Sequence, residues 1–182
     1  MRGFGLVWSA VLLGSVITLS GCAASDDGSA NTASPSKGEH PLLGTAGPAF
    51  SRPIVVGGQG ATSIDALHGK VAIVDFWATW CEPCKKSFPK LQELNVKYGS
   101  SGVQIVGVSE DDDADGIPMF AKGLGTKFPL VWDSEKAIAA KWSPKSMPCT
   151  FILDRSGIVR FVHFGYHDGE EATIEQELKS LL

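Results

Sequence analysis

The chain has few of the features that mark disulfide-stapled or nucleic-acid-binding proteins. Its four cysteines in 182 residues are too few to staple a small scaffold. Lys and Arg total 16 against 20 Asp and Glu, which gives a net charge of −4, and no block of basic residues occurs. This balance argues against a nucleic-acid partner. The hydrophobic fraction of 43% is ordinary, so one packed domain with additional segments is expected.

Long hydrophobic runs are also scarce. The mostly apolar run from Phe4 to Leu19 spans about 16 residues, which suits a signal peptide better than a membrane-spanning helix. It ends in Leu19-Ser20-Gly21-Cys22, which resembles a bacterial lipobox. The resemblance implies that residues 1–21 are a lipoprotein signal peptide and that Cys22 is lipidated. An ordinary cleaved signal peptide and an uncleaved anchor are the alternatives.

Several acyl chains on Cys22 would anchor the protein stably to a membrane. We therefore expect it in the cell envelope, facing the periplasm or another extracytoplasmic space. Ala23 would favour the outer membrane by a sorting rule that differs between lineages, so inner and outer membrane both stay open. Residues 22–46 are rich in small and polar residues, which is typical of a flexible tether. The folded domain is expected over residues 47–182.

Two cysteines, Cys81 and Cys84, form a CxxC motif between a strand-like and a helix-like segment. Strand, CxxC and helix in this order are typical of a redox dithiol. The N–H groups and dipole at a helix N-terminus stabilise a thiolate. Cys81 is therefore predicted to be the nucleophile, with a pKa below the roughly 8.5 of a free thiol. Cys84, one helical turn on, would attack the mixed disulfide that Cys81 forms.

The alternative for a CxxC motif is half of a structural zinc site, which needs two further ligands, commonly at short spacing. Cys22 and Cys149 each stand alone, and His163 and His167, four residues apart, follow a strand-like run. The context favours the redox dithiol, so no metal and no cofactor besides the Cys81–Cys84 disulfide is expected.

Strand-like and helix-like segments alternate along the domain. The apolar run Val71–Trp77 has the pattern of a parallel strand buried on both faces, except for Asp75. The acids of 111–115 are placed to begin a helix through Phe120. A hairpin turn at 154–157 and a helix over 170–182 end the chain. The sequence predicts an α/β domain with a mixed central sheet flanked by helices.

These features together resemble the thioredoxin superfamily, and more closely its TlpA/ResA-like branch. The residues that carry the resemblance are Val74–Cys84, Pro89, and Met147-Pro148 before a Phe-Ile-Leu-Asp strand. The segment between Val108 and Leu130 fits the strand–helix insertion of that branch. The resemblance covers about residues 47–182. It implies a thioredoxin-like fold with a TlpA/ResA-type insertion.

The resemblance implies a membrane-tethered thiol–disulfide oxidoreductase that acts on protein substrates with disulfides. Cytochrome c maturation is one task of the branch. A separate membrane electron donor is implied, because nothing in this chain can carry electrons across a membrane. The resemblance also implies a cis bond before Pro148, in a loop that faces the dithiol and offers the Met147 backbone to a peptide. An ordinary trans loop is the alternative.

Asp75 is the candidate proton acceptor. A carboxyl in a buried strand has a raised pKa and can exchange protons near neutral pH. By resemblance to thioredoxin it would help to deprotonate Cys84, although many relatives in the TlpA/ResA branch have Asn there. The alternative is an acid that caps a backbone group or reaches solvent.

Three residues around the dithiol are candidates for tuning or binding. The charge of Glu82 should oppose thiolate formation, unless it is simply solvated. Pro83 restricts the CxxC turn and suits a first helical turn. Trp80 is a candidate substrate platform, with packing at the rim as the alternative.

Two further residues are candidates of a weaker kind. ResA-like proteins have an acid near the end of the second strand, and Asp112 is favoured for that place over Glu110, Asp111 and Asp113. A solvated helix start is the alternative. Cys149 is unexpected after Pro148 and is predicted to lie near the dithiol. It could join a metal site, form another disulfide or fill the core, and we favour the last.

Three functions therefore compete. The first is a reductant of extracytoplasmic protein disulfides. The second is a copper(I)-binding chaperone that uses Cys81, Cys84 and Cys149, since soft thiolates hold Cu(I). The third is a disulfide oxidase or isomerase, because the CxxC motif alone does not fix the direction of exchange.

Overall fold

The computed structural model describes residues 40–182, and in this part the chain forms one seven-stranded mixed sheet with the order β2-β1-β5-β4-β3-β6-β7. The neighbouring strands β3, β4 and β5 run parallel to one another. The pairings β3–β6 and β6–β7 at one edge, and β5–β1 and β1–β2 at the other, are antiparallel. The predicted α/β fold with a mixed sheet is confirmed. The strands are β1 Ser51–Val56, β2 Ala61–Ser63, β3 Val71–Trp77, β4 Val103–Ser109, β5 Leu130–Trp132, β6 Cys149–Leu153 and β7 Val159–Phe164.

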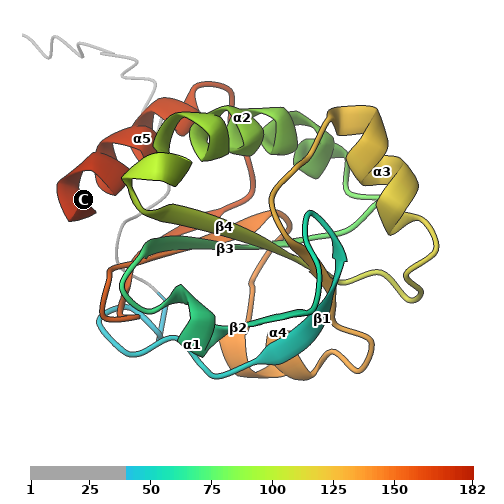
Figure 1. Cartoon of the computed structure of the whole chain (residues 1–182), viewed down its shortest axis with the longest axis horizontal. Coiled ribbons are helices and arrows are strands. Elements are labelled where there is room, and N and C mark those ends of the chain that lie inside the picture. Colours follow the sequence, from blue (N-terminus) through green and yellow to red (C-terminus); the bar gives the residue numbers. More distant parts are fainter. Residues whose placement is uncertain (1–39) are drawn as a thin grey trace, which may run out of the picture. The chain divides into compact units, whose positions relative to one another are not determined.

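Helices cover both faces of the sheet. In Figure 1, α2, α3 and α5 lie on one face, and α1 and α4 lie on the other. None of the helices within residues 40–182 is long and apolar enough to cross a membrane. The helices are α1 Ile64–Leu67, α2 Glu82–Tyr98, α3 Ile117–Leu124, α4 Ala137–Trp142 and α5 Glu170–Leu181, with a 3₁₀ turn, η1, at Gly99–Ser101.

The interior strand β3 contributes side chains to two hydrophobic clusters, one on each face of the sheet. Ile73 and Trp77 pack in the cluster that includes Cys81 and Cys84. The alternate residues Ala72, Val74 and Phe76 pack in the other cluster. Side chains alternate along a strand, so Asp75 lies on the face that α2 covers. All seven β3 residues are buried, as the apolar pattern predicts.

The predicted helix through Phe120 is present as α3, but its predicted start among the acids of 111–115 is wrong, because α3 begins at Ile117 and residues 111–116 form a loop. The carboxylate of Asp111 binds Thr79 instead of capping a helix. Pro118 lies in the first turn of α3, where a helix tolerates proline. The insertion therefore begins as a loop that joins the end of β4 to α3.

Residues 40–46, which fall in the predicted tether, pack on the domain. The His40 ring stands edge-on to Phe151 with their centroids 5.0 Å apart. The Gly44 N–H donates to the Val159 carbonyl at 2.8 Å, and the Val159 N–H donates to the Thr45 carbonyl at 2.9 Å. The packed domain therefore includes residues before the predicted start at 47.

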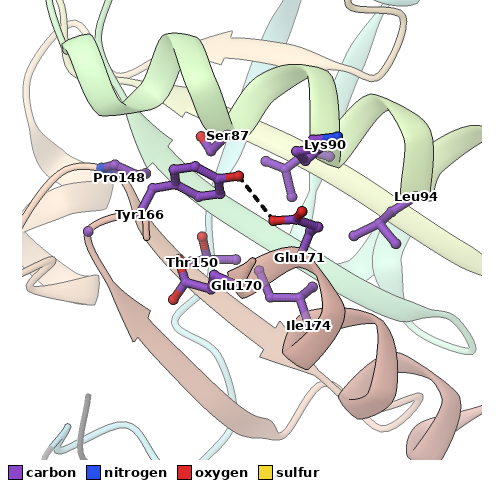
Figure 2. A pocket seen from close by; sticks show the side chains of 11 residues that line it. Ser87, Lys90, Leu94, Pro148, Thr150, Tyr166, Glu170, Glu171 and Ile174 are labelled. Carbon is purple, nitrogen blue, oxygen red and sulfur yellow. Dashed lines mark hydrogen bonds between the residues drawn. The ribbon is translucent and has the colours of Figure 1, made fainter. Parts of the chain in front are cut away.

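A small pocket lies between α2, α5 and the ends of β6 and β7 (Figure 2). Tyr166 reaches across it and donates a hydrogen bond to Glu171 at 3.0 Å. Pro148 and Thr150 border the same pocket, as do Ser87 on α2 and Glu170 on α5. The pocket therefore adjoins the Pro148 loop and strand β6, whose Thr150 contacts Asp75.

Candidate active site

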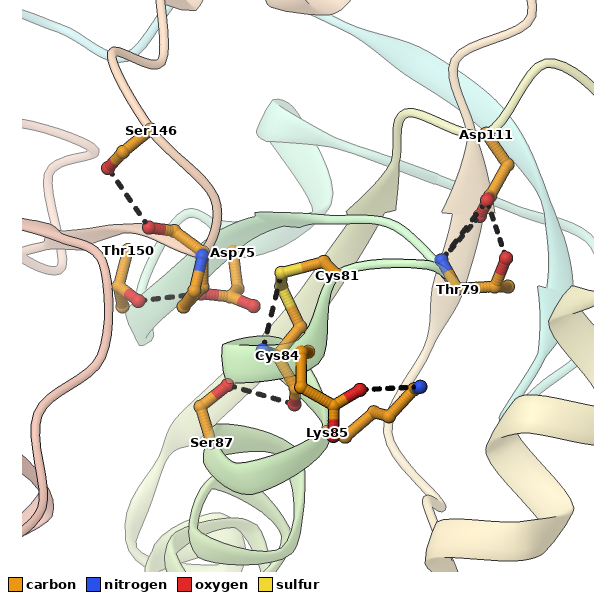
Figure 3. The surroundings of a disulfide bond; sticks show 11 residues. Asp75, Thr79, Cys81, Cys84, Lys85, Ser87, Asp111, Ser146 and Thr150 are labelled. Atoms are coloured by element: carbon orange, nitrogen blue, oxygen red, sulfur yellow. Dashed lines mark hydrogen bonds and ion pairs between the residues drawn. A yellow bond between two sulfur atoms is a disulfide. The ribbon is translucent and has the colours of Figure 1, made fainter.

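Cys81 and Cys84 form a disulfide at the N-terminus of α2, with an S–S distance of 1.99 Å and 5.3 Å between their Cα atoms (Figure 3). Cys81 is the N-cap of the helix, and its Sγ accepts a hydrogen bond from the Cys84 N–H at 3.3 Å. Cys81 is 4% exposed and Cys84 is 0% exposed. The Cys81 sulfur is thus the more accessible of the two and is placed to react with the thiol or disulfide of another molecule.

The local sequence explains this geometry. β3 ends at Trp77, a buried residue that anchors the start of the active-site loop. Pro83 lies in the first turn of α2, where its missing N–H has no intrahelical role. Glu82 lies in the same turn, where a negative charge meets the positive end of the helix dipole.

A buried carboxylate holds the loop that precedes Cys81. Asp111 is 6% exposed and accepts the Thr79 N–H at 3.1 Å and the Thr79 hydroxyl at 2.7 Å. The Ser109 hydroxyl donates to the same carboxylate at 2.8 Å. The Trp132 indole N–H donates to the Asp111 carbonyl at 2.9 Å. The ends of β4 and β5 thereby fix the segment from Ala78 to Trp80.

Asp75 lies on the α2 face of β3, the side of the sheet that carries the disulfide, and is fully buried. Its Oδ1 accepts the Thr150 hydroxyl at 2.6 Å, and within residues 40–182 its Oδ2 has no hydrogen-bond partner. Burial raises the pKa of Asp75 to about 7, with the Thr150 hydrogen bond opposing and the charge of Glu170 adding to the rise. Asp75 is buried as predicted, and its role in proton transfer stays a prediction.

The Met147–Pro148 peptide bond is cis, as predicted. Met147 packs against the hydrophobic cluster that contains Cys81 and Cys84, so its loop lies on the dithiol side of the sheet. The Pro148 carbonyl accepts the Gly165 N–H at 2.8 Å, which ties the loop to the segment after β7. Binding of a peptide by Met147 and Pro148 stays a prediction.

The remaining candidates around the dithiol lie on the surface. Trp80 is 64% exposed, which a substrate platform requires. Glu82 forms an ion pair with Lys85 at 2.8 Å, and this contact lowers the pKa of the Glu82 carboxyl. The effect of Glu82 on the thiolate is therefore partly offset by its partner.

Cys149 does not lie with the dithiol. Its side chain packs in the hydrophobic cluster on the opposite face of the sheet, together with Phe76 and Phe151. Burial raises the pKa of the Cys149 thiol to about 12. Within residues 40–182 no three His, Cys, Asp or Glu side chains are placed to hold a metal ion. The expected proximity to the dithiol is wrong, and with it the three-cysteine copper site.

Asp112 also lies away from the site. Its side chain is fully exposed and stands 4.0 Å from the Lys136 ammonium. The buried acid at the end of β4 is the neighbouring Asp111. Burial and the hydrogen bonds with Thr79 and Ser109 distinguish Asp111 from Asp112, and these features arise only in the folded protein. Cys22 lies outside the described residues.

The fold and these residues define a thioredoxin-like protein with a CxxC disulfide at a helix N-terminus and a cis-proline loop beside it. The sequence model of the AhpC/TSA family matches residues 43–162, about two thirds of the chain. The chain belongs to that family.

Individual relatives agree with this assignment. The thiol-disulfide oxidoreductase ResA of Bacillus subtilis is 36% identical over 93 residues, which are 51% of this chain and 52% of that protein. The protein of the same name from Geobacillus kaustophilus is 32% identical over 114 residues, 63% of this chain and 64% of its own. The match thus spans about half the length of the Bacillus relative.

Solved structures share the fold. A Chlorobium tepidum protein assigned as a thiol:disulfide interchange protein DsbE superposes with a TM-score of 0.72 at 29% identity, over 76% of this chain and 96% of that one. A second Chlorobium tepidum thiol:disulfide interchange protein, of the thioredoxin family, gives 0.66 at 25% identity, over 75% and 95%.

Proposed function

We propose that this protein is a thiol–disulfide oxidoreductase that reduces disulfides of extracytoplasmic proteins. The observation that carries the proposal is the Cys81–Cys84 disulfide, in which the outer sulfur caps α2 and the inner one is fully buried. The related thiol-disulfide oxidoreductases and interchange proteins support the same chemistry.

The proposed reaction begins with the reduced protein. The Cys81 thiolate attacks one sulfur of a substrate disulfide, and the other substrate sulfur leaves as a thiolate and takes a proton. Cys84 loses its proton to Asp75 and attacks the Cys81 sulfur. This step forms the Cys81–Cys84 disulfide and releases the second substrate thiol. Two electrons have then passed to the substrate, and an external dithiol donor must return them.

Location and partners are part of the proposal. A lipid on Cys22 would tether the domain to the cell envelope on its extracytoplasmic side, and a membrane protein would supply the electrons. The relatives named ResA make cytochrome c maturation a reasonable task to test. Radiolabelled palmitate should be incorporated into the wild-type chain and not into Cys22→Ser.

The test of the activity is reduction of insulin with dithiothreitol as the electron source. We expect wild-type protein to accelerate insulin precipitation and Cys81→Ser to have no more effect than buffer. Cys149→Ala is the matched control, since it removes a thiol on the other face of the sheet and should retain activity. Full activity of Cys81→Ser would refute the assignment.

A further inference from the structure

The exposed side of α3 forms an apolar groove beside the dithiol. Met119 is 80% exposed. Single exposed apolar residues are common on protein surfaces and do not by themselves indicate a binding site. What distinguishes Met119 is its place in a groove with other apolar and small residues. The lining residues are Gly116, Met119, Phe120, Gly123 and Leu124 along α3, with Lys85 of α2 on the opposite side.

The floor of this α3 groove is fixed and its sides are open. The Phe120 ring packs 4.5 Å from the Trp77 ring and 5.2 Å from the Phe88 ring, so the hydrophobic core holds it in place. A Cβ added at Gly123 would meet no atom within 4 Å. The space beside Gly123 is therefore open, next to an aromatic ring that the core holds in place.

The α3 groove is continuous with the surface around Cys81. A Cβ added at Gly116 would lie 3.4 Å from the Thr79 methyl group, and Thr79 precedes Cys81 by two residues. Lys85 directly follows Cys84. Residues on both sides of the CxxC motif thus lie at the groove, Thr79 next to Gly116 and Lys85 in the lining, and Figure 1 shows α3 beside the first turns of α2. A polypeptide whose disulfide reaches Cys81 from the α3 side would lie over this surface.

The surface on the other side of the dithiol has a different character. A polar groove there separates the first turn of α2 from the segment between β7 and α5, and it includes the carboxylates of Glu82 and Asp168 with Lys86 and His167. The two sides of the dithiol therefore favour different side chains. The α3 groove has no carboxylate in its lining, whereas the other groove combines charged residues with Pro83 and Tyr166, so an apolar substrate residue fits the α3 side better.

We propose that the α3 groove binds a large apolar side chain of a disulfide-containing polypeptide while Cys81 attacks its disulfide. The inference rests on the proposed disulfide exchange and adds a substrate class to it: extended polypeptide segments with Leu, Ile, Met or an aromatic residue near the cysteine. Partial burial of one leucine in the groove corresponds to an increase in kcat/KM of about fourfold to tenfold.

The test compares Met119→Glu with Val96→Glu. Val96 is a matched control because it is also an exposed apolar residue on a helix, at 74% exposure, and lies on α2 about 18 Å along the axis from Cys84. The substrates are two disulfide-closed peptides that differ only in Leu or Ser beside one cysteine. The measured quantity is the ratio of kcat/KM for the Leu peptide to kcat/KM for the Ser peptide.

We expect a ratio of about four to ten for the wild-type protein and for Val96→Glu. In Met119→Glu the ratio should fall close to one. A ratio that is the same in all three proteins would overturn the proposal, whatever the absolute rates.

A second arm separates this proposal from the proposed function. The Leu peptide with both cysteines replaced by alanine cannot react, and its binding is followed by amide shifts in the NMR spectrum of the protein. Shifts on α3 that disappear in Met119→Glu support the groove even if no peptide is reduced. Reduction of both peptides without shifts on α3 would leave the activity standing and remove the groove.

Discussion

The carboxylate of Asp111 accepts hydrogen bonds from both the backbone N–H and the hydroxyl of Thr79, at 3.1 and 2.7 Å. Thr79 stands two residues before Cys81, so an acid at the end of β4 fixes the loop that delivers the reactive sulfur. Hydrogen bonds to an ionised, buried acceptor are stronger than neutral ones. The geometry of the dithiol is therefore set from outside the CxxC motif.

Asp111→Ala should lower the free energy of unfolding by about 2–3 kcal/mol, because it leaves the Thr79 N–H and hydroxyl without their charged acceptor. Asp112→Ala, at the fully exposed neighbouring position, should change it by less than about 0.5 kcal/mol. Urea denaturation of both variants in the oxidised state measures the difference. Equal losses in the two variants would show that the Thr79 contact contributes little.

Asp75 should make stability fall as pH rises. The pKa of this carboxyl is about 7 in the folded protein and 3.8 in the reference state, so the folded protein holds the extra proton between these values. Its contribution is fully present below pH 3.8 and is lost as pH rises through 7. The cost above pH 7 is on the order of 4 kcal/mol.

Asp75→Asn should therefore unfold at higher denaturant than the wild-type protein at pH 8, and the difference should shrink toward pH 4. Asp65→Asn, at an exposed position of α1, is the control. Denaturant midpoints across this pH range give the comparison. A constant difference between Asp75→Asn and the wild-type protein at all pH values would contradict the assigned titration.

His163 should have a pH dependence of its own. Its Nδ1 lies 3.1 Å from Glu170 and its Nε2 lies 2.7 Å from Glu177, both on α5. Burial alone would lower the pKa of the imidazole, but these two carboxylates outweigh it and raise the pKa to about 9. The stabilisation is full below pH 6.5 and is lost as pH rises through 9.

The loss over that range should be on the order of 3 kcal/mol in the wild-type protein. His163→Gln should flatten the dependence, and exposed His68→Gln should preserve it. Thermal unfolding at pH 6, 7.5 and 9 is the measurement. An unchanged slope in His163→Gln would mean that the two ion pairs do not titrate as described.

The Cys149 thiol should not react with alkylating reagents in the folded protein. Iodoacetamide added to the reduced native protein at pH 8 should modify Cys81 and leave Cys149 unmodified, because burial raises the pKa of the Cys149 thiol to about 12. In denaturant all three domain cysteines should react. Mass spectrometry of tryptic peptides identifies the modified residues, and rapid native labelling of Cys149 would contradict its placement in the core.

Local pattern was sufficient to predict most of the fold. The continuous apolar run of β3 and the helical spacing of α2 placed Cys81 and Cys84 correctly. Positions whose role depends on which face of the sheet they occupy were harder. Cys149 follows the cis-proline directly, but its place in β6 turns its side chain toward the other cluster. A shift of one residue along β6 would put the Cys149 side chain on the other face of the sheet, and the sequence pattern does not show which register the strand takes.

Long-range polar contacts could not be predicted for the same reason. Glu110, Asp111, Asp112 and Asp113 form one acidic run, and their chemistry is alike. Only the loop conformation selects Asp111 to face Thr79. The pair of carboxylates around His163 likewise comes from α5 packing on β7, over separations of seven and 14 residues.

The central claim is that Cys81 and Cys84 cycle between a disulfide and two thiols. The most direct test is a titration in dithiothreitol redox buffers, with free thiols labelled by a maleimide that shifts the gel mobility. We predict one two-electron transition that involves Cys81 and Cys84 and not Cys149. A midpoint near roughly −270 mV would agree with a reductant, and one near roughly −120 mV would make the protein an oxidant. If the labelling of Cys81 and Cys84 does not change across the titration, the account is wrong.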